Sequence, residues 1–189
     1  MANVKKYILT SVILGSIAAV SAGVIAATNL ITKEKIEQNA VLKLEKGLVE
    51  IFDNSNASIL DDEPIDETYT DSSSKYIIKM SNFYKVENNE NKDFLGYAVR
   101  CEGSNDYGKI DLIAGFEATG LKFKSICLIT NEQSYASTLD KEYIDPVKNG
   151  GDYDSEDAVH CGATFGATLV RAMIRASQDL VNKKGAKNV

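Results

Sequence analysis

The hydrophobic residues of this chain are distributed unevenly, with one long uninterrupted run near the beginning. No charged residue occurs between Lys6 and Lys33, and residues 7–27 consist mainly of Ile, Leu, Val, Ala and Gly. A helix needs about 20 apolar residues to cross the hydrocarbon core of a bilayer, and this run is long enough. The pattern therefore predicts a transmembrane anchor over residues 7–30, preceded by a short cytoplasmic segment, residues 1–6.

The charges that flank this run predict its orientation. Lys5 and Lys6 precede it, which favours an N-terminus on the cytoplasmic side. We therefore expect a single-pass protein of the cell membrane whose C-terminal domain is extracytoplasmic. A cleaved signal peptide is the alternative, because the small residues 19–22 resemble a cleavage site. The run continues past Ala22 and exceeds the usual apolar region of a signal peptide, about 7–15 residues, which favours the uncleaved anchor.

Residues 31–74 are predicted to form a helix and an acidic connecting segment. Apolar residues recur mainly at three- and four-residue steps in residues 32–52, as in an amphipathic helix. We interpret this helix as a spacer that packs on its own domain rather than as a catalytic element. Residues 53–74 are acidic and rich in Ser, which predicts a solvated loop or irregular segment.

The remaining residues, 75–189, have a sequence pattern that predicts a domain with both strands and helices. Four segments rich in β-branched and aromatic residues predict strands. They are residues 75–80, 93–103, 109–118 and 121–130. A turn at 118–120 predicts a hairpin between the last two segments. The chain is polar and irregular from 131 until Thr168. An apolar stripe then predicts a C-terminal helix, with Val170, Met173, Ile174 and Val181 on one face. The fold class is therefore predicted to be α+β, a mostly antiparallel sheet with flanking helices.

Charge and cysteine content exclude several functions. The formal net charge is −6 and no basic patch stands out, so a nucleic-acid partner is not expected. The single histidine and the absence of a Cys-x-x-Cys pair argue against a metal site. Outside the cytoplasm Cys101 and Cys127 could form a disulfide. They could equally be small buried thiols.

The candidate chemistry lies in residues 157–173, where Gly-Ala-Thr occurs twice ahead of the predicted helix. A helix N-terminus exposes unpaired N–H groups and stabilises an anionic group such as a phosphate. Small residues at this place allow a large ligand to approach the backbone. A threonine here can donate to a phosphate or carry a phosphoester. The alternative is a threonine N-cap followed by small residues that pack tightly.

These residues resemble a known motif. Cys161-Gly-Ala-Thr164 resembles the flavinylation motif Asp-x-x-Ser/Thr-Gly-Ala-Thr/Ser of FMN-binding domains. The motif occurs in the G subunit of Rnf-type ion-translocating ferredoxin:NAD oxidoreductases and in the C subunit of the sodium-pumping NADH:quinone reductase. Residues 28–39 resemble the segment that follows the membrane helix in this family. Residues 96–130 resemble its hairpin region, including Gly96-Tyr97 and Tyr107-Gly108.

The resemblance implies that residues 75–189 form an FMN-binding domain. A dedicated flavin transferase would attach FMN through its phosphate to Thr164, with Thr168 as a rival attachment site. Cys161, Gly162 and Ala163 would complete the motif, and Glu132 would match a family stretch that lines the flavin. The protein would then be a membrane-anchored electron-transfer subunit that works with the other subunits of a complex, rather than a free-standing enzyme with catalytic residues of its own.

The chain departs from the family pattern at several positions. Cys161 stands where the family has Ser or Thr, and Asp157 lies one residue too far upstream. Gly166-Ala167 replaces a Thr-Ser pair, and residues 131–137 lack the Pro and Gly of the flavin-lining stretch. The alternative is therefore an anchored extracytoplasmic domain without a redox role, which keeps the fold for assembly or ligand binding.

Overall fold

The computed structural model describes residues 14–16, 18–24 and 41–185. The chain divides into two units, residues 1–42 and 43–189. In the first unit, residues 14–16 and 18–24 are helical and exposed. Within the described residues, no helix has the length and apolar character needed to cross a membrane. The other residues of the predicted anchor, 7–13, 17 and 25–30, lie outside the described part of the chain.

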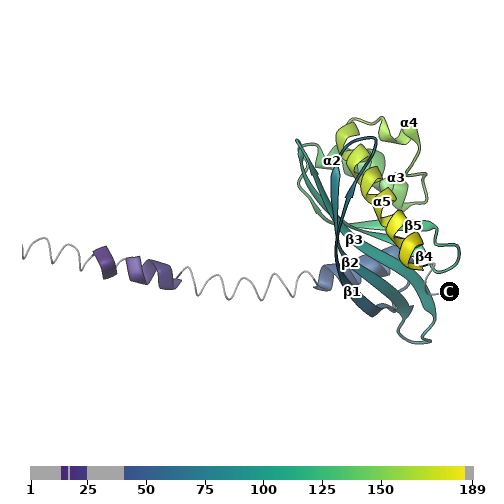
Figure 1. Cartoon of the computed structure of the whole chain (residues 1–189), viewed down its shortest axis with the longest axis horizontal. Helices are drawn as coiled ribbons and strands as arrows, with labels where there is room; N and C mark the ends of the chain where they lie inside the picture. The colour runs from purple at the N-terminus through teal and green to yellow at the C-terminus, as the bar shows by residue number, and fades with distance from the viewer. Residues whose placement is uncertain (1–13, 17, 25–40, 186–189) are drawn as a thin grey trace, which may run out of the picture. The chain divides into compact units, whose positions relative to one another are not determined.

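The described part of the second unit contains a five-stranded antiparallel sheet whose strand order follows the chain (Figure 1). The strands are β1 (Ala57–Thr70), β2 (Ile77–Asn88), β3 (Phe94–Asn105), β4 (Gly108–Glu117) and β5 (Phe123–Asn131). All four predicted strand segments are confirmed as β2 to β5. The predicted hairpin is also confirmed, because β4 and β5 pair antiparallel across the turn that contains Gly120.

β1 corrects the prediction for residues 53–74, which is wrong in assigning a loop. This strand pairs with β2 along its length, with register shifts near Ile59 and Pro64. Most of its side chains are exposed, because it forms one edge of the sheet and carries few core residues. Acidic residues and an irregularity at a proline are typical of edge strands, which must avoid pairing with other chains. The segment that looked like a connection is therefore part of the folded domain.

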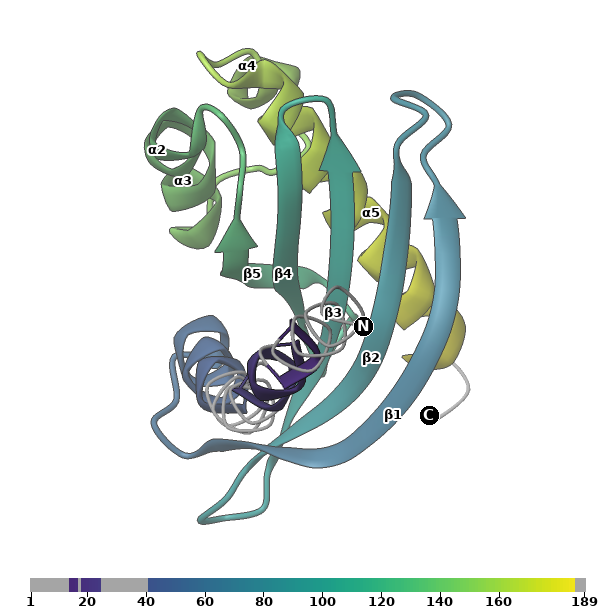
Figure 2. The same cartoon turned by 90° about the vertical axis from the view of Figure 1, so that its left-hand side faces the viewer.

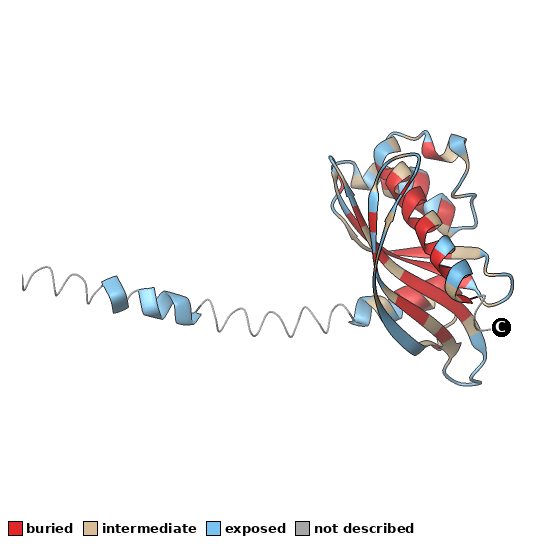
Figure 3. Cartoon of the chain, viewed as in Figure 1, coloured by how far each residue is buried: buried red, intermediate tan, exposed pale blue. Residues whose placement is uncertain are grey.

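The sheet has a hydrophobic core on each face. α5 (Thr164–Gly185) covers one face, and the helix over residues 41–52 lies on the opposite face (Figure 2). Alternation along β3 produces this division, since Val99 belongs to the α5 side and Ala98 to the other. Figure 3 shows the buried residues that result along α5 and the middle of the sheet. The structure thus has the predicted α+β arrangement.

Both predicted helices have described residues in this unit; of the helix predicted over 32–52, residues 32–40 lie outside the described part of the chain. Leu48, Ile51 and Phe52 of the helix over residues 41–52 are buried against the sheet, which confirms a spacer packed on its own domain. The predicted stripe of the C-terminal helix is also buried, namely Val170, Met173, Ile174 and Val181. However, α5 begins at Thr164, one turn earlier than the apolar stripe indicates.

The irregular segment predicted after residue 131 is wrong in part. It folds into the short helices α2 (Ala136–Leu139), η1 (a π-helix, Asp140–Ile144), α3 (Asp145–Lys148) and α4 (Glu156–Val159). Four apolar residues of the first three helices are buried, namely Leu139, Tyr143, Ile144 and Val147. They anchor an otherwise polar segment beside β5 and α5. Each helix is too short to leave a recognisable periodicity in the sequence.

The structure decides between the two interpretations of the cysteines. Cys101 lies in the core on the α5 side of the sheet, whereas Cys127 lies in the core on the opposite side. Both are free, as is Cys161. The interpretation of Cys101 and Cys127 as small buried thiols is therefore confirmed, and they do not form a disulfide.

Candidate functional site

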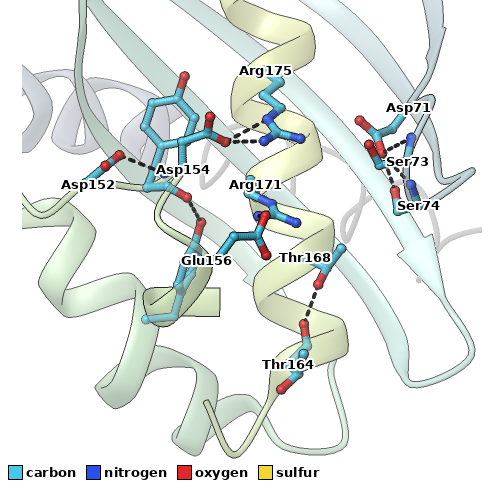
Figure 4. Close-up of polar contacts among 12 residues, drawn as sticks. Asp71, Ser73, Ser74, Asp152, Asp154, Glu156, Thr164, Thr168, Arg171 and Arg175 are labelled. Carbon is cyan, nitrogen blue, oxygen red and sulfur yellow. Dashed lines mark hydrogen bonds and ion pairs between the residues drawn. The ribbon is translucent and has the colours of Figure 1, made fainter. Parts of the chain in front are cut away.

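The two Gly-Ala-Thr threonines occupy the first turns of α5. The Thr164 hydroxyl donates a hydrogen bond to the Cys161 carbonyl at 2.7 Å, and the Thr168 hydroxyl donates to the Thr164 carbonyl at 2.8 Å. Figure 4 shows this second bond running along the helix. An N-cap side chain instead accepts a hydrogen bond from a backbone N–H. Neither threonine makes such a contact within the described residues, so the capping interpretation is wrong.

The small residues of the motif allow α5 to begin against α2 and η1. A Cβ atom on Gly162 would lie 2.9 Å from Thr138 Cγ2, and one on Gly166 would lie 2.8 Å from Leu139 Cδ2. Contacts this short force a neighbouring atom to move. The interpretation that small residues permit tight packing is therefore confirmed for these two glycines.

A cavity of about 220 Å³ lies beside this helix start. Thr164 lines it, and Thr168 does not. Its other lining residues come from the β3–β4 turn, the segment after β5 and the motif, namely Tyr107, Gln133, Tyr135, Leu139, Gly162, Ala163, Phe165 and Gly166. The site therefore combines a part-buried threonine hydroxyl, the N-terminal end of a long helix and three aromatic side chains.

Gln133 supplies a buried polar group to the cavity. Its side chain is 7 % exposed, and its Nε2 donates to the Gly108 carbonyl at 2.6 Å. Its Oε1 accepts no hydrogen bond from the described residues and lies 3.4 Å from where a Gly166 Cβ would be. Among the described residues, no fully buried side-chain oxygen lacks a hydrogen-bond partner, so this amide oxygen is accessible from the cavity. The cavity therefore offers a hydrogen-bond acceptor to a ligand.

The structure brings together only part of the predicted site. Gly162, Ala163 and Thr164 line the cavity. Cys161 does not line it, although its carbonyl accepts the Thr164 hydrogen bond. Glu132 is exposed and is also absent from the lining, since the next residue, Gln133, faces the cavity instead.

Sequence reasoning missed the aromatic residues and Gln133. Tyr107 belongs to the Tyr107-Gly108 pair that resembles the family hairpin, and Gln133 directly follows Glu132, so weak signals existed for both. Phe165 lies between the two Gly-Ala-Thr repeats. Tyr135 had no signal beyond its proximity to Glu132.

The charge around the motif is negative. The Glu142 carboxylate accepts a hydrogen bond from the Gly162 N–H at 2.7 Å. A negative charge is stabilised near a helix N-terminus by the unpaired N–H groups and the helix dipole. No lysine or arginine is among the residues that line the cavity. Any anionic ligand at Thr164 would therefore depend on backbone N–H groups.

The segment that leads into the motif is tied to α5 by ion pairs (Figure 4). Arg171 donates to Glu156 at 2.7 Å, and Arg175 donates to Asp154 at 2.7 Å. The hydrogen bond and the positive charge of Arg171 lower the pKa of Glu156 below its ordinary value. These contacts hold the segment that precedes the motif against α5, the helix that follows the motif.

Comparison with known families supports the resemblance at the N-terminal end. Residues 1–51 match the family model of the RnfG N-terminal region. The chain resembles RnfG. The matched region includes residues 28–39, on which the resemblance partly depends, and it ends before β1. A comparison with curated proteins gives no match. The RnfG match supports a membrane-associated subunit of a multi-subunit, Rnf-type electron-transport complex.

Proposed function

We propose that this chain is the membrane-anchored electron-transfer subunit of an Rnf-like ion-translocating complex, and that it carries FMN as a phosphoester on Thr164. One observation carries the proposal. The Thr164 hydroxyl lines a cavity at the N-terminal end of α5, in a chain whose residues 1–51 match RnfG. The anchor would comprise residues 7–30, with the folded domain outside the cytoplasm. This domain would begin at residue 43 rather than 75, because β1 belongs to the sheet.

The residues around Thr164 fit a flavin nucleotide in three respects. The hydroxyl is an attachment point, the first turn of α5 presents backbone N–H groups to a phosphate, and Tyr107, Tyr135 and Phe165 offer aromatic faces. When bound, the flavin accepts and donates electrons, while the protein supplies position and electrostatics. Glu142 opposes a phosphate, because its carboxylate carries a like charge and accepts a hydrogen bond from the Gly162 N–H.

Attachment requires a flavin donor in which the FMN phosphate is activated as a phosphoanhydride, supplied by a flavin transferase. The bond from Thr164 Oγ1 to phosphorus forms, the anhydride P–O bond breaks, the other phosphate-bearing half of the donor leaves as a phosphate monoester, and the hydroxyl proton passes to solvent. The chain gains FMN less one water. Redox chemistry at the ring is unaffected, because the bond is made at the phosphate.

Thr164 is a better attachment site than Thr168. Only Thr164 lines the cavity, and it lies at the first position of α5 beside the unpaired N–H groups. Thr168 lies one turn inside the helix and donates its hydroxyl proton to the Thr164 carbonyl. A phosphoester on either threonine removes a hydroxyl hydrogen bond, but one on Thr168 would also place the phosphate away from the helix end.

The test is the intact mass of the full chain after co-expression with a flavin transferase. Wild type and Thr168→Ala should each gain one FMN less water, and Thr164→Ala should gain nothing. Thr164→Ser is the matched control, because it keeps a hydroxyl at the same place and should still be modified. A gain that persists in Thr164→Ala and disappears in Thr168→Ala would reverse the ranking.

The alternative is an anchored extracytoplasmic domain that keeps this fold for assembly or ligand binding without a redox role. The contact between Glu142 and Gly162 favours it, because a carboxylate already uses one N–H group of the motif. It predicts that wild type gains no mass with an active transferase. That result would overturn the proposal.

A further inference from the structure

A second cavity adjoins the first. It has a volume of about 380 Å³ and is lined by the β1–β2 and β3–β4 turns, the adjoining ends of β2 and β3, and Phe165. Tyr107 and Phe165 line both cavities. Their rings are stacked, with centroids 5.1 Å apart and planes inclined by 23°. The two aromatic side chains therefore form a wall between the cavities.

This wall is exposed although it is apolar. Phe165 is 58 % exposed, yet it occupies the second position of the longest described helix. The Asn105 side chain donates to the Phe165 carbonyl at 3.1 Å, which ties the start of α5 to the end of β3. A flat aromatic surface held in place in this way suits a planar ligand, because aromatic rings gain from offset stacking beyond the area they bury.

We infer that the Tyr107–Phe165 wall is the surface on which the isoalloxazine ring of the Thr164-linked FMN lies, on the side of the second cavity. This inference rests on the proposed function. Phe165 directly follows Thr164, so a phosphoester at Thr164 places the flexible ribityl chain beside the wall. The ribityl hydroxyls can donate to Gln133 Oε1, which has no other partner among the described residues.

The residues of the second cavity support the placement of the ring there. This cavity is the larger of the two, and its charged lining residues are Lys75 and Asp106, whereas no charged residue lines the first. Lys75 lies at the end of a turn in which its N–H donates to the Asp71 carbonyl at 2.9 Å. A positive charge near an isoalloxazine favours the more negative, reduced flavin. Lys75 would therefore raise the reduction potential of the bound flavin.

The experiment compares variants of the FMN-loaded full chain. In Tyr107→Leu combined with Phe165→Leu, flavin emission is compared with wild type per bound FMN, and intact mass measures how much FMN each protein carries. Flavin emission should rise severalfold toward that of the denatured protein, because a stacked tyrosine quenches flavin fluorescence by electron transfer. Phe94→Leu is the matched control. Phe94 is as exposed as Tyr107, at 38 %, and lies at the opposite end of β3, so emission should not change.

A second measurement tests on which side of the Tyr107–Phe165 wall the isoalloxazine ring lies. Lys75→Gln should make the reduction potential more negative, whereas Lys79→Gln, on the neighbouring strand and outside this cavity, should not. Unchanged emission per bound FMN in the double variant would overturn the inference and leave the proposed function standing. An unchanged potential in Lys75→Gln would overturn the placement in the second cavity. A wild type without mass gain would overturn the proposed function and this inference together.

Discussion

The Glu142 carboxylate and the Gly162 backbone N–H are joined by a hydrogen bond of 2.7 Å. Glu142 belongs to the π-helix η1, and Gly162 belongs to the motif that precedes α5. π-helical turns are rare and frequently occur at functional sites. The bond places a negative charge beside the one hydroxyl to which we assign a phosphate.

We predict that Glu142→Gln increases the rate at which FMN is attached. The amide oxygen can still accept from Gly162, but the repulsion between the carboxylate and the incoming phosphate is removed. The effect on the free energy of unfolding should be under about 1 kcal/mol, because the hydrogen bond is exposed. A time course of intact mass during co-expression with the transferase measures the rate.

Asp145→Asn serves as the control for Glu142→Gln, since Asp145 is an exposed acid of the adjacent helix with no contact to the motif. It should load at the wild-type rate. Slower loading of Glu142→Gln would contradict the prediction, and it would assign the carboxylate an assisting role in attachment.

We predict that Gly108→Ala destabilises the domain far more than Gly150→Ala. Both glycines have positive φ, +140° and +88°, where a side chain is strained. A Cβ on Gly150 meets nothing within 4 Å, so the cost should be about 1 kcal/mol. A Cβ on Gly108 would lie 2.1 Å from the Glu132 carbonyl oxygen, so the cost should be about 3 kcal/mol or more.

Urea unfolding of the two alanine variants checks this difference. Gly108→Ala should also disturb the cavity, because the Gly108 carbonyl holds the Gln133 side chain. Equal unfolding free energies for the two variants would mean that the segment after β5 moves away from Gly108 without cost.

The sequence predicts β2 to β5 well because these segments are rich in β-branched and aromatic residues, many of which are buried in the core. It fails for β1 because few of that strand's side chains enter the core. Two of its acids, Glu63 and Glu67, instead pair with Lys184 and Lys183 at the end of α5. Such partners lie more than a hundred residues away, and no local pattern contains them.

The candidate site is predictable only where it is contiguous in sequence. Gly162, Ala163 and Thr164 form one motif, and all three line the cavity. Tyr107 and Gln133 reach the same cavity because the β3–β4 turn and the segment after β5 meet the start of α5, which is a property of the topology. Glu132 and Gln133 are adjacent in the sequence, but only Gln133 lines the cavity. Neighbouring side chains of an extended segment point in opposite directions, so a shift of one residue changes which side chain faces the cavity.

We predict that Cys161 alone reacts with iodoacetamide in the native protein. Cys101 and Cys127 are buried, and burial raises the pKa of Cys101 to about 12 and that of Cys127 to about 11. Their thiolate fractions at pH 8 are therefore negligible. Cys161 is partly exposed.

Intact mass after alkylation checks the cysteine prediction. The native protein should gain one carbamidomethyl group and the unfolded protein three, without prior reduction. Cys161→Ser should remain unmodified in the native state. An unfolded protein that gains only one group before reduction would instead mean that the other two thiols are joined in a disulfide.

We predict that Asp71→Asn destabilises the domain at pH 7 and much less at pH 3. Asp71 is 3 % exposed, and burial alone would raise its pKa. Hydrogen bonds from Ser74 and Ser73 outweigh burial, so the pKa lies below its ordinary value of 3.8 (Figure 4). A carboxyl group with a lowered folded-state pKa stabilises the fold above its unfolded pKa, and this contribution is lost as the pH falls through the folded value.

Urea unfolding at the two pH values measures the effect of Asp71→Asn. The loss at pH 7 should be about 1–2 kcal/mol, because hydrogen bonds to a charged group are replaced by bonds to a neutral amide. Asp152→Asn is the control. Asp152 also accepts a backbone N–H, from Asp154, but it is exposed, so little change is expected at either pH. A loss for Asp71→Asn that is as large at pH 3 as at pH 7 would show that the side chain stabilises this turn by shape rather than by charge.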